Sequence, residues 1–278
     1  MTLIAMSREM GSLGMDVAQR VAERRNQKVI YHEILDQLAS KMRLRKSHVV
    51  RFLDGKSGIW EKLTTDKTSL SIYTADETFR MLKGDGVAVI RGWGAAHLLK
   101  EVPHVIRVRI CAPLALRVER MMERLGTDDR AFVENEIALS EEAQSAITRR
   151  HFGVDWRDPE HYDVVLSTER LTIDECVDEL EGFMEMERVQ RTESSIRVFN
   201  DLSLQWHVRA ALRHDPRTTQ MNVLIRAENG IVQLSGLLEP GISVADAIAI
   251  ASAVEGVKKV SSDLKELAGT GSRYKREA

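Results

Sequence analysis

Residues 2–22 constrain the fold more than any other part of the chain. Residues 2–6 are typical of a short buried strand, residues 7–14 form a turn with two glycines, and residues 15–22 have helical periodicity. A strand, a glycine-containing turn and a helix in this order hold phosphate in α/β proteins, because backbone N–H groups and the helix amino terminus converge on one anion. No lysine lies between Ser7 and Ala22, so the pattern G-x-x-x-x-G-K-[ST] is incomplete. The segment predicts a phosphate-binding turn and leaves open whether phosphate chemistry accompanies it.

Strand-like and helix-like segments alternate from Met1 to about Met186. Beyond the first strand and helix, we expect strands at 28–31, 87–90, 105–110 and 162–166, and helices at 32–42, 115–125 and 173–186, with residues 43–85 mostly helical. The run Val87-Ala88-Val89-Ile90 is typical of a strand buried on both faces of a parallel sheet. Repeated βα units predict an α/β fold with a doubly wound parallel sheet whose ligand lies at the carboxyl ends of the strands.

The composition is that of an ordinary globular protein, with 43% hydrophobic and 29% charged residues. A formal net charge of −2 argues against a design for nucleic acid or an anionic membrane. No apolar run reaches the roughly 18 residues that span a bilayer, and no basic segment precedes the first strand as in a secretory signal. Cys111 and Cys176 lie in apolar patterns and are expected to be buried free thiols. We therefore expect a cytoplasmic protein with no transmembrane segment and no nucleic-acid partner.

The last third of the chain follows a different pattern. Residues 188–196 are polar and indicate a linker, and residues 201–212 form an amphipathic helix. Alternating apolar residues flank a hairpin turn at Asn229-Gly230, Ser243 can cap a helix that runs to Val254, and residues 257–264 form a final strand. The order α-β-β-α-β predicts a second domain over residues 197–268, followed by a disordered tail over 269–278.

Several motifs of this second domain carry a resemblance. They are an acidic helix start at Asp201, Ala211-Leu212 near the helix end, the Asn229-Gly230 hairpin, Val-Gln-Leu-Ser-Gly at 232–236, and Val-Glu-Gly-Val-Lys-Lys-Val at 254–260. Together they resemble a BON domain, a small α+β fold. The resemblance implies a module that binds a small ligand, phospholipid or protein, and no signal sequence here supports the membrane role.

The first domain, residues 1–187, carries a second resemblance. Its motifs are Ile-Ala-Met-Ser-Arg-Glu-Met-Gly-Ser at 4–12, Val-Ile-Arg-Gly-Trp-Gly-Ala at 89–95, Val-Arg-Ile-Cys-Ala-Pro at 108–113, Trp-Arg-Asp-Pro at 156–159, and Tyr-Asp-Val-Val-Leu-Ser-Thr at 162–168. In this order they resemble the cytidylate-kinase-like family of P-loop proteins. The resemblance implies a P-loop kinase fold, bound ATP and Mg²⁺, and transfer of the γ-phosphoryl group to a nucleoside monophosphate.

Three departures from the family pattern bear on catalysis. Leu13 stands where relatives have a glycine that lets backbone approach phosphate. Trp93 replaces an arginine, although Arg91 lies two residues earlier, and Gln144 stands where an arginine usually follows the acidic residue matched by Glu141. Phosphoryl transfer depends on cations placed around the phosphates, so these changes weaken the case for turnover.

The candidate site residues follow from the turn and the resemblance. For phosphate binding they are Ser7, Gly11, Ser12, Gly14 and Arg91, and for catalytic charge they are Arg8, Arg149 and Arg150. No metal ligand is assigned, because Asp16 either holds Mg²⁺ through water or only complements the helix dipole. Gly11→Val is expected to abolish nucleotide binding while leaving the fold intact.

Plainer alternatives stay open for each motif. The glycines of the turn can serve only strand–helix packing, and Arg149 and Arg150 can belong to a solvated helix face. Trp93 either stacks on a nucleobase or fills the space of the missing arginine, and His32 and Glu33 either contact the acceptor or start a surface helix. A basic cluster is either a helical arm over the acceptor site or solvated surface; its members are Arg43, Arg45, Lys46, His48 and Arg51.

Two functions fit these observations. The first is a cytidylate-kinase-like phosphotransferase of weak or absent catalysis, regulated through the BON module. The alternative is a non-catalytic pseudokinase that senses a nucleotide, or another phosphate-bearing small molecule, and acts in signalling or as an adaptor; a purely structural protein is a third option. The acceptor nucleotide, the BON ligand and the oligomeric state, a homo-oligomer included, stay open.

Overall fold

The computed structural model describes residues 2–30, 67–84, 86–92 and 94–266. Several predicted features lie outside these residues: the helix at 32–42 with His32 and Glu33, the basic cluster Arg43–Arg51, Trp93, and the tail at 269–278. Two compact units divide between Val198 and Phe199.

The first unit is built on a five-stranded sheet in the order β2-β3-β1-β4-β5, in which every pairing is parallel. The strands are β1 (Leu3–Arg8), β2 (Lys28–Ile30), β3 (Val87–Arg91), β4 (Val105–Cys111) and β5 (Val164–Ser167). Central β1 pairs in register with both neighbours, Ile4 lying opposite Val89 of β3 and Ile106 of β4. The chain forms β2 and β3 on one side of β1 and β4 and β5 on the other. The switch point, where ligands bind in such sheets, is therefore the carboxyl end of β1.

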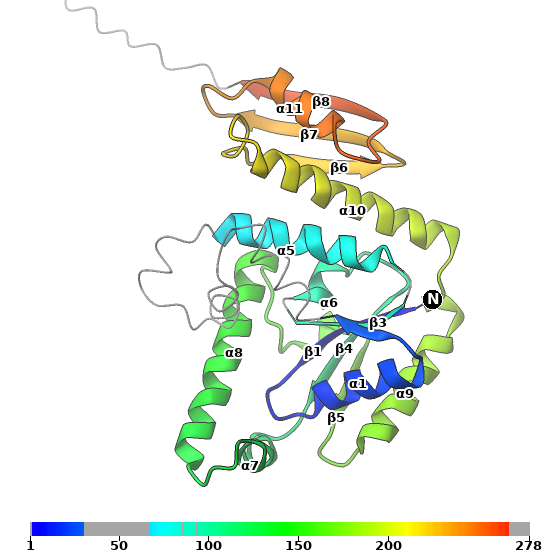
Figure 1. The fold of residues 1–278 in the computed structure, drawn as a ribbon, viewed down its shortest axis with the longest axis vertical. Helices are drawn as coiled ribbons and strands as arrows, with labels where there is room; N and C mark the ends of the chain where they lie inside the picture. The colour runs from blue at the N-terminus through cyan, green and yellow to red at the C-terminus, as the bar shows by residue number, and fades with distance from the viewer. Residues whose placement is uncertain (1, 31–66, 85, 93, 267–278) are drawn as a thin grey trace, which may run out of the picture. The chain divides into compact units, whose positions relative to one another are not determined.

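Helices cover both faces of this sheet. They are α1 (Gly14–Arg24), α5 (Lys67–Leu82), α6 (Ala95–Leu98), α7 (Leu114–Leu125), α8 (Arg130–Phe152) and α9 (Ile173–Glu185), with short 3₁₀ turns at η1 (Pro159–His161) and η2 (Glu187–Val189). Figure 1 shows α1 and α9 side by side on one face of the sheet, with α5 and α6 on the opposite side. The expected α/β fold with a parallel sheet is confirmed.

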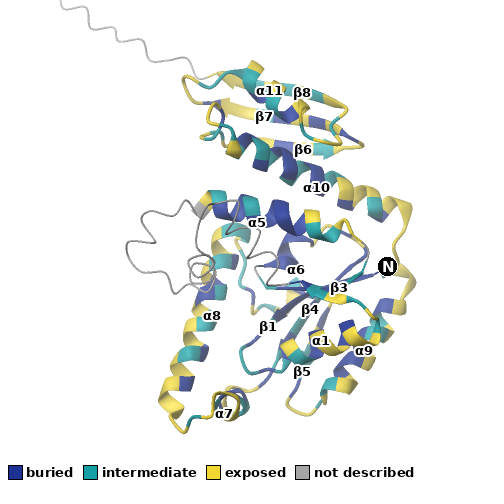
Figure 2. Cartoon of the chain, in the orientation of Figure 1, coloured by how far each residue is buried: buried dark blue, intermediate teal, exposed yellow. Residues whose placement is uncertain are grey.

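The core of the first unit lies between the sheet and the α1–α9 pair. Ile4 and Met6 of β1 meet Val17 and Val21 of α1 and Leu180 of α9, and all five are almost completely buried. The central strands are accordingly dark in Figure 2. Burial of these side chains, at about 25 cal/mol per Å² of apolar surface, stabilises β1 and α1, the two elements that flank the turn.

The second unit is a three-stranded sheet covered on one face. Its elements are α10 (Glu193–His214, which begins within the first unit), β6 (Leu224–Glu228), β7 (Ile231–Leu238), α11 (Val244–Ser252) and β8 (Lys259–Glu266). Strands β6 and β7 are antiparallel, and β7 and β8 are parallel. Leu204 and Val208 of α10 pack with Val232 and Leu234 of β7 and Ala247 of α11.

The segment predicted as a linker has regular structure in part. Residues 187–189 form η2, and α10 begins at Glu193, inside the expected linker of 188–196. The side chain of Ser195 is buried, and its Oγ lies 3.0 Å from Nδ1 of His104. This buried polar contact ties the start of α10 to the first unit, which a polar sequence alone does not reveal.

Both cysteines are free thiols, as predicted, with Cys176 buried and Cys111 half-buried. Burial raises the pKa of the Cys176 thiol to about 11. Among the helices of the described ranges, none combines the length and apolarity that a bilayer crossing requires.

Candidate phosphate-binding site

The turn between β1 and α1 has a tightly folded backbone. Gly11 has φ +82° and Leu13 has φ +58°, both in the left-handed region. The backbone N–H of Ser12 donates to the carbonyl of Glu9 at 3.2 Å, and the Ser12 hydroxyl donates to the same oxygen at 2.8 Å. These bonds fold residues 9–12 back on themselves at the carboxyl end of β1.

The amino terminus of α1 opens on this turn without a side-chain cap. Leu13 occupies the N-cap position, and its side chain makes no capping hydrogen bond. The first bond inside the helix runs from the N–H of Val17 to the carbonyl of Leu13 at 3.0 Å. The N–H groups of Gly14, Met15 and Asp16 precede it and have no partner inside the helix. Such amides, with the positive end of the helix dipole, form an anion site.

The two glycines of the turn are also required by packing. A Cβ on Gly11 would lie 2.6 Å from the carbonyl oxygen of Arg117, and a Cβ on Gly14 would lie 2.7 Å from Cβ of Arg8. The expectation that Gly11→Val leaves the fold intact is therefore wrong. Valine would strain a positive φ and also collide with the backbone of α7, so loss of binding in that variant would not report on phosphate contacts.

The turn itself carries a buried carboxylate. Glu9 is 8% exposed, and its Oε1 lies 2.6 Å from Nη2 of Arg109 on β4. Its Oε2 lies 3.3 Å from Nε of Arg117 on α7 and accepts from the N–H of Ala112 at 3.1 Å. Both oxygens are thus held by protein groups, and Glu9 engages both Arg109 and Arg117.

Arg117 has further partners around the turn. Its Nε donates to the carbonyl of Ala112 at 2.9 Å, and its Nη1 donates to the carbonyl of Met10 at 3.3 Å. Nη1 also lies 2.9 Å from Oε1 of Glu141 on α8. The sequence analysis did not assign Arg109 or Arg117 to the site. The sequence signal for them was an acidic residue, Glu9, inside the predicted phosphate turn.

A third set of contacts fixes the other side of the turn. The carbonyl of Ser12 accepts from the hydroxyl of Thr168, just after β5, at 2.9 Å. Arg120 of α7 donates to the Thr168 hydroxyl at 2.9 Å and to its carbonyl at 2.8 Å. Thr168 thereby joins the end of β5 directly to the turn, and Arg120 of α7 holds Thr168. Neither Arg120 nor Thr168 was singled out from the sequence as a site residue.

The structure brings most of the predicted binding residues to the end of β1. Gly11, Ser12 and Gly14 share the turn, and the aliphatic stem of Arg8 packs against Gly14. Arg91 is the last residue of β3 and lies opposite Met6 of β1, which is the strand-end position its proposed role requires.

Two predicted hydroxyl groups have other partners. The Ser12 hydroxyl closes the turn on the Glu9 carbonyl. Ser7 is buried in β1, and its side chain is hydrogen-bonded to Tyr162. Burial raises the pKa of Tyr162, and this hydrogen bond lowers it by a smaller amount. Both serine hydroxyls therefore have partners within the protein, whereas the first amides of α1 have none inside the helix.

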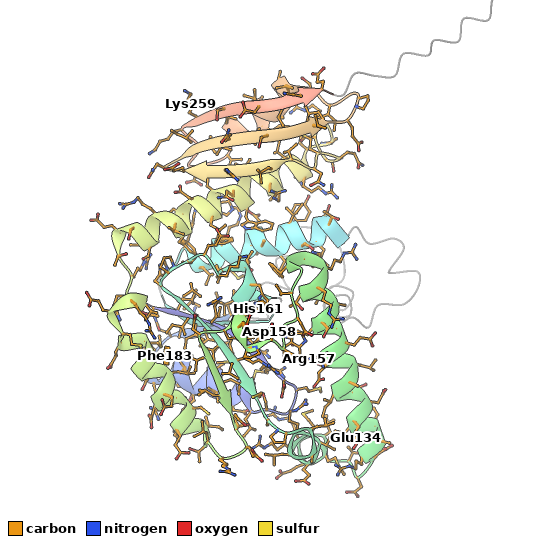
Figure 3. The ribbon with its side chains drawn as sticks, turned by 180° about the vertical axis from the view of Figure 1, so that it is seen from behind. Glu134, Arg157, Asp158, His161, Phe183 and Lys259 are labelled. Carbon is orange, nitrogen blue, oxygen red and sulfur yellow. The ribbon has the colours of Figure 1, made fainter. Side chains whose placement is uncertain are left out.

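The two arginines predicted for catalysis lie at the far end of α8. Arg149 is 63% exposed at its side chain and pairs with Asp155 at 3.3 Å, and Arg150 is exposed. Among the described residues, no hydrogen bond or ion pair joins either of them to the turn. Arg157 lies in the following loop, where its carbonyl accepts a hydrogen bond from Nη1 of Arg109; Figure 3 shows it near Asp158 and His161.

A buried histidine lies behind the loop that follows β3. His97 of α6 is 6% exposed, and its ring lies 5.3 Å from that of His161 and 5.6 Å from that of Phe152, between centroids. Burial, followed by the charges of His161 and Arg107, lowers its pKa to about 4. A Cβ on Gly94 would lie 2.5 Å from Phe152, so this glycine allows α8 to pack closely on the loop.

The described residues hold no group of three or more His, Cys, Asp or Glu side chains that could bind a metal ion by themselves. Mg²⁺ in nucleotide enzymes is usually held by one or two carboxylates together with substrate phosphates. Asp16, in the first turn of α1, is the acidic residue nearest the open amides in sequence, and it pairs with Arg124 at 3.0 Å. One carboxylate at this position fits such a shared site.

The parallel five-stranded sheet, the β1 turn at its switch point and the open α1 amides define an α/β protein of the nucleotide-kinase class. Residues 3–170 match the model of the cytidylate kinase-like family, and this match covers more than half of the 278 residues. The chain belongs to the cytidylate kinase-like family. The resemblance predicted from the turn and the later motifs is confirmed for the first unit.

Individual relatives are more distant. The cytidylate kinase of Methanosarcina barkeri (strain Fusaro / DSM 804) is 29% identical over 85 residues, which cover 27% of this chain and 42% of that protein. An uncharacterized protein from Eubacterium ventriosum ATCC 27560 has a similar structure, with a TM-score of 0.52 and 21% identity over 67% of this chain and all of that one. Shikimate kinase from Acinetobacter baumannii, solved with shikimate, has a TM-score of 0.42 at 12% identity, covering 68% of this chain and 96% of that one.

Proposed function

We propose that the first unit binds the phosphates of a nucleotide at the β1–α1 turn and transfers a phosphoryl group from ATP to a nucleoside monophosphate only weakly. The observation that carries the proposal is the uncapped first turn of α1 at the sheet's switch point. Three adjacent amides there have no partner inside the helix, in a chain of the cytidylate kinase-like family.

The charge around the turn supports weak turnover. Phosphoryl transfer needs cations that contact the transferring group in its transition state. Arg109 and Arg117 are engaged by Glu9 and Glu141, and Arg149 is held in a surface pair with Asp155. Arg8 and Arg91, at the ends of β1 and β3, are the cations we assign to the phosphates.

The same observation favours a second candidate function, a pseudokinase that binds a nucleotide without turning it over and signals the bound state. Backbone amides and a helix dipole are sufficient for binding, whereas catalysis needs the additional cations. The support for this alternative is the carboxylate of Glu9, which pairs with Arg109 and Arg117.

ATP and Mg²⁺ are the groups that this site would hold. The amides of Gly14, Met15 and Asp16 suit the phosphates, and Asp16 suits a magnesium ion shared with them. When bound, Mg²⁺ would neutralise charge that develops on the phosphate oxygens. The residues of the chain would bind and orient the phosphates, while Glu9 holds Arg109 and Arg117 next to the turn.

We propose further that the second unit is a BON module that regulates the first. The support is its element order, α10-β6-β7-α11-β8, together with the motifs at Asn229-Gly230 and at 232–236 and 254–260. Its ligand is a small molecule or a protein.

A calorimetric titration of the full chain with ATP and with CMP, each with and without Mg²⁺, tests the proposed function. Saturable binding of ATP is expected, with ADP formed slowly when CMP and Mg²⁺ are both present. Binding with no ADP formed selects the pseudokinase over the kinase. Absence of binding by every nucleotide would refute both and would direct attention to the second unit.

A further inference from the structure

The turn shares a small hydrophobic core with the α7–α8 pair. Val118 and Met121 of α7 pack with Val133 and Ile137 of α8, and the side chain of Met10 in the turn packs against this cluster. Met10, in the phosphate turn, therefore packs against two helices that lie more than 100 residues later in the chain.

The contact is reinforced by close approach of backbone. Gly11 lies so near to α7 that a Cβ would be 2.6 Å from the carbonyl oxygen and 3.0 Å from Cβ of Arg117. Interiors packed this tightly do not deform continuously, so a displacement of α7 displaces the turn.

A buried arginine joins the three segments electrostatically. The side chain of Arg117 is 7% exposed and contacts the Met10 carbonyl, the Glu9 carboxylate and, at 2.9 Å, the Glu141 carboxylate. Glu141 is 23% exposed and belongs to α8, whereas Glu9 and Met10 belong to the turn. One guanidinium thus spans from α8 to the turn, and charge-assisted bonds of this kind are stronger than neutral ones.

We propose that Glu141, acting through Arg117, is a positioning residue of the phosphate turn, and that occupancy of the turn is coupled to the placement of the α7–α8 pair. An anion bound at the α1 amides stabilises one backbone shape of residues 9–14. Because Met10, Gly11 and Glu9 all contact α7 or Arg117, the same shape fixes α7 and, through Glu141, α8. The identity of the anion as a nucleotide rests on the proposed function; the link itself rests on the contacts of Arg117, Met10 and Gly11.

The chain supplies a matched control on the same helix. Glu134 also lies on α8 and also pairs with an arginine, Arg130, at 2.9 Å. That pair is one turn apart within the helix and half exposed, and Figure 3 shows Glu134 at the end of α8 away from Arg157. Glu134→Gln removes an equal charge from α8 but breaks no contact with Arg117 or the turn. It therefore distinguishes the effect of the Glu141–Arg117 pair from a general effect of charge on α8.

The experiment compares amide hydrogen exchange and ADP affinity in the full chain for wild type, Glu141→Gln and Glu134→Gln. Glutamine keeps the shape of Glu141 but not its charge. For Glu141→Gln we expect faster exchange over residues 9–16 without ligand, unchanged exchange in β1 and β4, and about tenfold weaker ADP binding. In wild type, ADP is expected to slow exchange in α7 and α8 as well as in the turn. Glu134→Gln is expected to behave as wild type in every respect.

A second variant keeps the test decisive. Arg117→Lys retains the charge but cannot reach the turn and α8 with one planar group, so the same local acceleration over residues 9–16 is expected. Exchange in Glu141→Gln equal to that in Glu134→Gln, or raised uniformly across the sheet, would overturn the link even if ADP binds normally. If wild type binds neither ADP nor ATP, the proposed function fails, and the exchange of the ligand-free variants still decides whether Glu141 positions the turn.

Discussion

Leu13 shows how a single residue can bear on both stability and ligand approach. It holds the N-cap of α1 with φ +58°, a region in which the Cβ of an L-residue is crowded. A non-glycine residue in this conformation costs about 1 kcal/mol or more, and such strain persists only where surrounding packing imposes it. A leucine at this position therefore strains the backbone of the turn, where a glycine would not.

We predict that Leu13→Gly leaves the free energy of unfolding unchanged or raises it by up to about 1 kcal/mol, since relief of strain offsets the greater freedom of glycine in the unfolded chain. Met15→Gly is the control, because Met15 is 39% exposed and lies in the first turn of α1. There glycine should lower stability by up to about 1 kcal/mol, its cost in a helix interior. Urea unfolding of both variants makes the comparison, and equal destabilisation would show that Leu13 is unstrained.

His97 makes the stability of the first unit depend on pH. Its pKa is lowered to about 4 by burial, whereas an unfolded histidine has a pKa near 6.5. Below pH 6.5 the unfolded chain therefore takes up a proton that the folded protein does not, and stability falls until the pH reaches about 4. We predict a loss of about 2 kcal/mol from this residue between pH 7 and pH 5. His97→Gln should remove this part of the change in unfolding free energy with pH, as measured by urea unfolding. An unchanged pH dependence would contradict a buried, neutral His97.

At the residue scale, local pattern was sufficient to place the turn. The positions of the turn glycines, Ser12, Arg8 and Arg91 at the ends of β1 and β3 follow from the order of strand, turn and helix, and their roles stay predictions. Arg109 and Arg117 could not be found in this way. Their partner Glu9 lies 100 residues or more before them, and no periodicity reveals which guanidinium meets which carboxylate.

At the scale of elements, the strands of the first unit were predicted closely, because a continuous apolar run of this length in an α/β chain is typical of a strand buried on both faces. The cap of α11 was predicted as well, with Ser243 accepting from the N–H of Ala245 at 3.2 Å. The position of α8 could not be predicted. It runs from Arg130 to Phe152 yet buries only Val133, Ile137, Ala143, Ser145 and Thr148, so its amphipathic pattern is weak. The contacts of α8 with the turn, through Glu141, depend on the tertiary fold.

The whole molecule joins two units with separate cores. The family match ends at residue 170, within the first unit, and the second unit lies entirely beyond it. Its element order agrees with the sequence prediction, because hairpin and capping signals are local. The expected linker is in part helical, since α10 begins at Glu193 and holds Ser195 against His104.

A chain that ends at Val198 keeps this buried contact and removes the second unit, whereas an end near Arg191 would expose His104. If the second unit regulates the first, the shortened chain should differ severalfold from the full chain in ATP affinity. Calorimetry on the two proteins makes the comparison, with thermal unfolding as the control for folding. Identical affinities would leave the second unit as an independent adaptor.

The central claim is that the open amides of α1 hold phosphate, and a substitution at Met15 tests it most directly. Proline is tolerated in the first turn of a helix and removes an N–H that no intrahelical bond uses, while Gly14 before it has no Cβ to clash. Met15→Ala keeps the N–H and serves as the control. The measurement is ATP affinity by calorimetry for the two variants at equal thermal stability. We predict affinity at least tenfold weaker for Met15→Pro than for Met15→Ala, and equal affinities would contradict phosphate binding at this turn.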